Sequence, residues 1–290
     1  MDAGTRCGDF RVLGPLEVAV GGRVLALGGP QLRAVLALLM AHAGRVVSVA
    51  ALVDGLWGEH PPPDAARTVR TYVSRLRQAL PAAAGTRAEE LIVTRPPGYA
   101  LRLDPDSVDA ARFERLVAAG RRALEAGQPA VAAGRLAAAL ELWRGEAYGE
   151  FGEIAALRAE GMRLERLRRT AVENRIDADL AAGMGGELIA ELEGLTDRYP
   201  GHERLWGQLM MALYRAGRQT DALQAFQRAR ALLIEESGLA PSPGLAEIQR
   251  QVLAHDSRLF AARAAGPGGS PSAPSGAATA SGACLRRPEQ

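Results

Sequence analysis

Arginine and short hydroxyl side chains gather in one stretch of the chain, residues 65–80. On a helical wheel of about 100° per residue, Val73, Leu76 and Leu80 fall within about 40° of Val69 and predict a narrow buried stripe. No residue of this stretch is acidic. The side chains that we expect on its exposed side and flanks are Arg67, Arg70, Thr71, Ser74, Arg75, Arg77 and Gln78.

Such a helix face has the chemistry to recognise duplex DNA. A helix fits the major groove, where arginine can bind guanine O6 and N7 in a bidentate way, and Thr, Ser and Gln can contact bases or phosphates. Arg95 precedes a Pro96-Pro97-Gly98 bend, from which it can reach a minor groove or a phosphate. The alternative is a solvated basic helix that contacts nothing, and the order of the surrounding elements favours DNA binding.

The number of arginines is a weaker argument than their position. All 35 basic residues are arginine, and alanine and glycine are abundant, which is typical of a GC-rich genome. Residues 1–103 carry 12 Arg against 8 acidic residues, a net charge of +4, and the remainder carries 23 against 25, a net of −2. The overall charge of +2 therefore conceals a basic N-terminal part.

Composition and motifs exclude several classes of protein. The chain has 290 residues, 48% of them hydrophobic, which is enough to bury a core. It contains no uncharged apolar run of about 18 residues, so we expect no membrane span. We find no secretory signal either, and therefore expect a cytoplasmic protein. Cys7 and Cys284 lie near opposite ends and indicate neither a disulfide framework nor a zinc site.

Enzymatic chemistry is not indicated. The four histidines, at positions 42, 60, 202 and 255, lack the spacing of metal ligands, and no hydrolase, metalloprotease or dinucleotide-binding motif occurs. Carboxylates lie beside arginines on helices, where solvated ion pairs are the usual outcome. We therefore expect no enzyme activity, metal or cofactor.

The elements of the first part follow a recognisable order. Gly21-Gly22 is a hairpin signal, Ser48 and Asp64 can cap helices, and Gly58 can end one. Strands are expected at residues 10–13, 16–20, 23–27, 91–94 and 99–103, and helices at 30–43, 49–57 and 65–80. Three strands, three helices and a final hairpin form the order of a winged helix-turn-helix domain, and its third helix is the basic one.

The chain becomes almost entirely helical after Asp104. Gly183 and Gly217 each follow a helix and lie 34 residues apart, which is the tetratricopeptide period. Helices are expected at residues 109–127, 129–143, 154–182, 186–199, 202–217 and 219–237. The last repeat fits best through Trp206, Leu209, Ala222, Phe226 and Ala229. Such repeats form a solenoid, which can serve in dimerisation and packing or bind a regulator or partner. Both interpretations stay open.

These patterns predict a mainly α chain with a small β component. We expect a flexible N-terminus at residues 1–9, a winged helix-turn-helix domain at 10–103, an all-α tetratricopeptide-like domain at 104–258, and a disordered tail rich in Ala, Gly, Pro and Ser at 259–290.

Residues 10–103 resemble the OmpR-type winged helix-turn-helix output domain. The matching motifs are Leu56-Trp57-Gly58, Arg67-Thr68-Val69, residues 72–80 and Arg95-Pro96-Pro97-Gly98-Tyr99. The resemblance implies that Arg67, Arg75 and Arg77 contact DNA and that Arg95 lies in the wing. Ser74 stands where many relatives have arginine, so their base preference cannot be transferred. Trp57 and Tyr99 either pack near DNA-backbone contacts or are core aromatics.

Residues beyond 104 resemble the bacterial transcriptional activator domain. The motifs are Trp143-Arg144-Gly145, Glu173-Asn174-Arg175, residues 202–206, residues 213–219 and Ala222-Leu223. Together the two parts, about residues 10–256, resemble the Streptomyces antibiotic regulatory protein (SARP) family. This implies a nucleoid-associated activator, at least dimeric on DNA. It would bind direct repeats near the −35 region, recruit RNA polymerase holoenzyme through its sigma factor, and control an antibiotic cluster.

Two further questions stay open at this stage. The loop carrying Glu59, His60, Pro61 and Pro62 is either a polymerase-facing surface or a plain connector. We find no phosphate-binding loop motif and no receiver domain before residue 10, so aspartyl phosphorylation is not the evident switch. The alternative function is a tetratricopeptide-type adaptor whose basic domain does not bind DNA.

Overall fold

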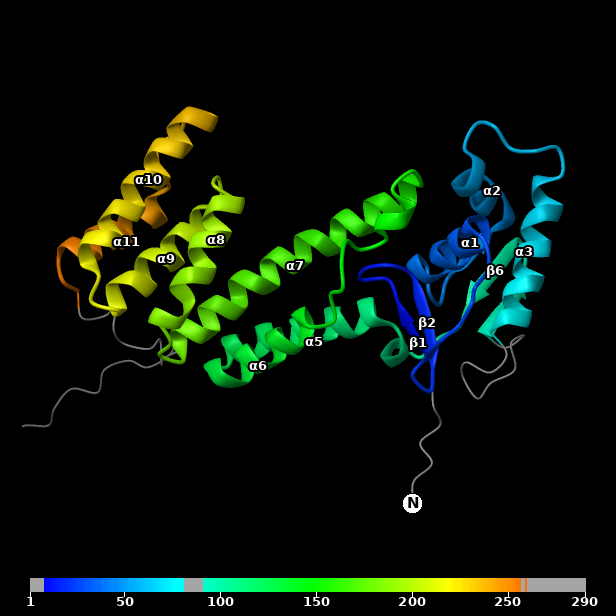
Figure 1. The fold of residues 1–290 in the computed structure, drawn as a ribbon, viewed down its shortest axis with the longest axis horizontal. Helices are drawn as coiled ribbons and strands as arrows, with labels where there is room; N and C mark the ends of the chain where they lie inside the picture. The colour runs from blue at the N-terminus through cyan, green and yellow to red at the C-terminus, as the bar shows by residue number, and fades with distance from the viewer. Residues whose placement is uncertain (1–7, 81–90, 257–258, 260–290) are drawn as a thin grey trace, which may run out of the picture.

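The computed structural model describes residues 8–80, 91–256 and 259. Cys7, Cys284 and most of the expected flexible N-terminus and disordered tail lie outside these residues. The described chain is mainly helical with two small sheets, which confirms the predicted fold class. Figure 1 shows an elongated arrangement, with the two sheets at one end and the last helices at the other.

Two three-stranded antiparallel sheets occupy the N-terminal end. The first has the order β1 (Asp9–Arg11), β2 (Glu17–Val20), β3 (Arg23–Val24), and the second has the order β4 (Val46–Ser48), β6 (Gly98–Leu101), β5 (Ile92–Arg95). The β2–β3 turn is Gly21-Gly22, and both glycines have positive φ, of 57° and 83°, as a tight hairpin requires. Strand β4 was not predicted.

Three helices pack with these sheets: α1 (Pro30–Ala41), α2 (Val49–Trp57) and α3 (Ala65–Ala79). The predicted stripe of α3 is buried, with Val69, Val73, Leu76 and Leu80 all at most 1% exposed. The Ser48 cap is confirmed, since its hydroxyl accepts the Ala51 N–H at 3.0 Å. The expected side-chain cap from Asp64 is wrong, because only its backbone carbonyl is used, by the Thr68 N–H and hydroxyl.

The second part consists of helices. They are η1 (Pro105–Ser107), α5 (Asp109–Glu125), α6 (Pro129–Leu140), η2 (Gly149–Phe151), α7 (Ala155–Ala181), η3 (Gly186–Leu188), α8 (Ile189–Arg198), α9 (Glu203–Arg215), α10 (Gln219–Ser237) and α11 (Pro243–Leu253). Gly183 and Gly217 follow α7 and α9 with φ of +95° and +76°, as expected of helix ends. Helix α11 was not predicted. None of the described helices is long and apolar enough to cross a membrane.

Two large hydrophobic cores meet along α7. The first includes Phe10 and Leu13, continues through Phe113 and Trp143, and extends along α7 to Ala171. Phe113 and Trp143 pack edge to face, with ring centroids 5.3 Å apart. The second core starts at residue 176 of α7 and centres on the fully buried indole at position 206. The first core contains residues from both sides of residue 104. The domain boundary there stays a prediction.

Candidate nucleic-acid interface

Helix α3 forms an outer edge of the molecule (Figure 1). The polar residues that are exposed on it are Arg67, Arg70, Thr71, Ser74, Arg75 and Gln78, as predicted. The side chains of Arg67, Arg70 and Arg75 make no hydrogen bond or ion pair with any described residue. The Thr71 hydroxyl donates to the Arg67 carbonyl at 3.1 Å, which leaves its oxygen able to accept. This face therefore presents cations and hydrogen-bonding groups to solvent.

Arg77 differs from the other arginines of α3. It is half-buried, and its Nε and Nη2 donate to the Ile92 carbonyl at 3.0 and 2.6 Å. Nη2 also donates to Thr94 Oγ1 at 2.9 Å, and the guanidinium lies 5.9 Å from the centroid of the Tyr99 ring. Arg77 thus attaches α3 to the β5–β6 hairpin, and its predicted contact with DNA stays a prediction.

The hairpin is also fixed on its other side. The Pro97 carbonyl accepts the Val49 N–H at the start of α2 at 3.2 Å, and Gly98 pairs with Ser48 of β4. A Cβ at position 98 would lie 1.9 Å from the Val47 carbonyl oxygen, so only glycine allows this approach. Arg95 is exposed beside the turn and has no side-chain partner among the described residues. The hairpin therefore holds this arginine on a rigid support next to α3.

The two aromatic residues singled out from the sequence belong to the packing. Tyr99 is 7% exposed and lies in the first core, while Trp57 is half-buried against that core. The structure therefore supports the interpretation of both as core aromatics. The loop after Trp57 is different, because Glu59, His60, Pro61 and Pro62 are all exposed.

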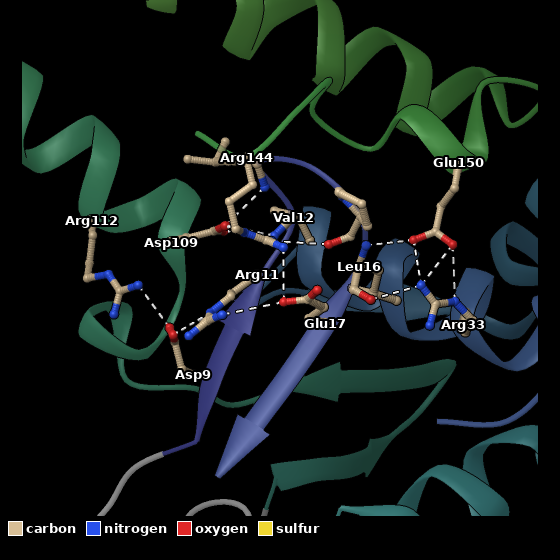
Figure 2. Close-up of polar contacts among 12 residues, drawn as sticks. Asp9, Arg11, Val12, Leu16, Glu17, Arg33, Asp109, Arg112, Arg144 and Glu150 are labelled. Carbon is tan, nitrogen blue, oxygen red and sulfur yellow. Dashed lines mark hydrogen bonds and ion pairs between the residues drawn. The ribbon is translucent and has the colours of Figure 1, made fainter. Parts of the chain in front are cut away.

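A polar junction connects the sheet end of the molecule to the helical part (Figure 2). The carboxylate of Asp109, 1% exposed, accepts the N–H groups of Val12 and Leu13 at 2.9 and 3.0 Å. Burial raises the pKa of this carboxyl, against the backbone donors and Arg144, which lower it. Sequence reasoning missed this residue because its partners lie almost one hundred positions earlier.

A second carboxylate completes this junction. Glu150 accepts the Leu16 N–H at 2.6 Å and forms an ion pair with Arg33 at 2.7 Å (Figure 2). Arg144 pairs with Glu17 at 3.0 Å. Arginines here are neutralised by carboxylates, whereas those on the outer face of α3 have no such partner among the described residues.

Both parts of the chain match models of known protein families. The family model described as the bacterial transcriptional activator domain matches residues 108–253, and that of the transcriptional regulatory protein C-terminal domain matches residues 23–101. The regulatory protein DnrI of Streptomyces peucetius is 38% identical over 252 residues, which cover 86% of this chain and 93% of DnrI. The chain belongs to the Streptomyces antibiotic regulatory protein family.

Other members and a solved structure agree. The regulatory protein AfsR of Streptomyces coelicolor is 41% identical over 86% of this chain, but the match spans 24% of AfsR. The transcriptional regulator RedD of the same species is 36% identical over 86% of this chain and 71% of RedD. The structure of Mycobacterium tuberculosis EmbR in complex with a low-affinity phosphopeptide has a TM-score of 0.83 and 35% identity. It covers 89% of this chain and 68% of the EmbR chain. These SARP-family matches are to transcriptional regulators.

Proposed function

We propose that this SARP-family chain is a sequence-specific transcriptional activator that inserts α3 into the major groove of DNA. The observation that carries the proposal is the acid-free exposed face of α3, where Arg67, Arg70 and Arg75 have no partner among the described residues. Arg75 reads a base edge, and Arg67, at the start of the helix, contacts a phosphate.

The remaining predicted contacts surround this pair. Arg70, Thr71, Ser74 and Gln78 share the exposed face and complete the contacts to bases and phosphates. Arg95, held by the hairpin, contacts the neighbouring minor groove or a phosphate. Helix α3 lies at the outer edge of the described part of the molecule, where a duplex can approach these residues (Figure 1).

Activation follows from contacts with the transcription machinery. The loop of Glu59, His60, Pro61 and Pro62 is exposed and precedes α3. When α3 is bound to DNA, this loop contacts the sigma factor of RNA polymerase holoenzyme. The protein binds direct repeats near the −35 region as a homodimer, in the nucleoid of the cytoplasm, and controls an antibiotic gene cluster. Family membership supports these assignments.

Replacing Arg75 tests the base-reading role. Genome-wide binding followed by footprinting identifies the operator, on which we expect Arg75→Ala to lose about 1–3 kcal/mol of binding free energy, roughly 5- to 150-fold, and to relax specificity at one position. The control is Arg166→Ala, which removes an exposed arginine from α7. Equal affinity of the folded Arg75→Ala variant and this control would refute the assigned recognition face.

Arg67 is expected to act through charge alone. We expect Arg67→Ala to weaken binding uniformly across DNA sequences and to reduce the slope of log K against log salt by about one, because one fewer counterion is released. Gel-shift titrations at several salt concentrations measure this slope. A slope that matches the wild type would contradict a phosphate contact.

A further inference from the structure

A cationic pocket lies where α7, α8 and α9 meet, remote in the fold from α3 (Figure 1). Its volume is about 120 Å³. The lining residues that carry the argument are Arg168, Arg169, Glu173, Arg198, Tyr199 and His202. The DNA-binding proposal makes no use of this pocket.

Two arginines of this pocket lack a carboxylate partner among the described residues. Arg169 and Arg198 each lie against the Tyr199 ring, 5.9 and 5.4 Å from its centroid, and neither forms an ion pair there. The nearby carboxylate of Glu173 is already engaged, by Arg204 at 3.0 Å.

Other polar side chains of the lining already have partners. Glu165 lies 3.7 Å from Arg168, and the His202 Nδ1 lies 3.4 Å from Glu173. The two unpaired guanidinium groups therefore leave an excess of positive charge in the pocket.

The backbone around the pocket is held firmly. Helix α9 begins at the pocket without a side-chain cap, but Glu203 in its first turn and the carboxyl end of α8 at Arg198 offset the partial positive charge of its amino end. The loop between α8 and α9 is fixed by the fully buried Trp206, whose indole N–H donates to the Pro200 carbonyl at 2.8 Å. The cationic groups therefore surround a preformed space, which lowers the cost of ordering them around an anion.

We propose that this pocket binds a phosphate group, supplied either by free phosphate or by a small phosphomonoester. Guanidinium groups pair with phosphate oxygens through charge-assisted hydrogen bonds, often bidentate. The volume suits one small group, since a cavity of about 150 Å³ accommodates a molecule the size of benzene. Any larger part of the ligand extends from the pocket into solvent.

Calorimetric titration of the full chain without DNA tests this site, so its result is independent of the DNA-binding proposal. The probes are inorganic phosphate and glycerol phosphate, at an ionic strength held constant with chloride. We expect saturable binding of at least one probe, and the probe that binds identifies the source. Arg169→Gln combined with Arg198→Gln is expected to weaken it about tenfold or more.

Arg166→Gln serves as the matched control, because Arg166 is an exposed arginine of the same helix outside the lining. It is expected to bind as the wild type does, and circular dichroism verifies that all variants are folded. Absence of saturable binding for both probes, or equal weakening by the control, would overturn the proposal.

Discussion

Two arginines that lie two residues apart on one helix have different surroundings. Arg75 is exposed and has no side-chain partner among the described residues, while Arg77 is half-buried and donates to the Ile92 carbonyl and the Thr94 hydroxyl. A helical wheel places both on the flanks of the buried stripe and cannot separate them. The hairpin acceptors of Arg77 lie 15 and 17 residues away, so the difference depends on tertiary packing.

Removing the Arg77 side chain is expected to reduce stability as well as DNA binding. Arg77→Ala should lower the free energy of unfolding by about 1–3 kcal/mol, because the Ile92 carbonyl loses both guanidinium donors. Amides of the β5–β6 hairpin should then exchange hydrogen faster. Arg75→Ala is the control and should unfold as the wild type does in urea. If Arg77→Ala also matched the wild type, its hydrogen bonds to the hairpin would contribute nothing.

Secondary structure was predictable where its signal is local. The predicted helix at 219–237 has the bounds of α10, because apolar periodicity is contained in the helix itself. Strand β4 was missed because three residues, Val46–Ser48, become a strand only by pairing with β6 some fifty positions later. Helix α11 also has a local start signal, because Ser242 caps it and Pro243 occupies its first position. Likewise, the exposed face of α3 was predictable from periodicity. The hydrogen bonds that join α3 to the β5–β6 hairpin were not, because they depend on tertiary packing.

The pairing of β4 with β6 depends on Gly98. Gly98→Ala places a Cβ 1.9 Å from the Val47 carbonyl oxygen and 2.7 Å from Ser48 Cα, and these are backbone atoms that cannot rotate away. We expect a loss of about 1–3 kcal/mol or more in unfolding free energy, together with weaker DNA binding as the hairpin moves. Thermal unfolding and gel shift measure the two effects.

Gly134→Ala is the matched control for this substitution. Gly134 is exposed within α6 and its Cβ would meet open space. Alanine there is expected to stabilise the helix by about 0.5–1 kcal/mol. If the Gly98→Ala variant unfolded at the same temperature as the wild type, the close approach of β4 and β6 at this position would not be needed for stability.

At the scale of the whole molecule, one hydrophobic core includes residues from both sides of the predicted domain boundary. Phe10 and Leu13 of the N-terminal part pack in the same core as Phe113 and Trp143, and the Asp109 carboxylate binds the backbone between them. Composition indicated a change of character near residue 104, but long-range burial cannot be read from composition. The sheet end of the molecule therefore depends on α5 and α7 of the second part to cover its core.

An isolated fragment of residues 1–103 is expected to be unstable. It would expose the apolar surface that α5 and α7 cover, and the Val12 and Leu13 N–H groups would lose their acceptor. We expect a lower, less cooperative thermal transition and stronger binding of a hydrophobic dye than for a chain of residues 1–260, which keeps both large cores. A fragment that unfolds at the same temperature as the longer chain would contradict this.

Helix α7 is a single long helix that joins the two large hydrophobic cores. Its 27 residues extend about 40 Å, with Leu157 and Leu164 embedded in one core and Ile176 and Leu180 in the other. A tilt of about 5° at one end displaces the other end by roughly 3 Å over that length. The helix is thus a lever arm, and a small rotation of the carboxyl-terminal helices moves the sheet end by a distance comparable to a hydrogen bond.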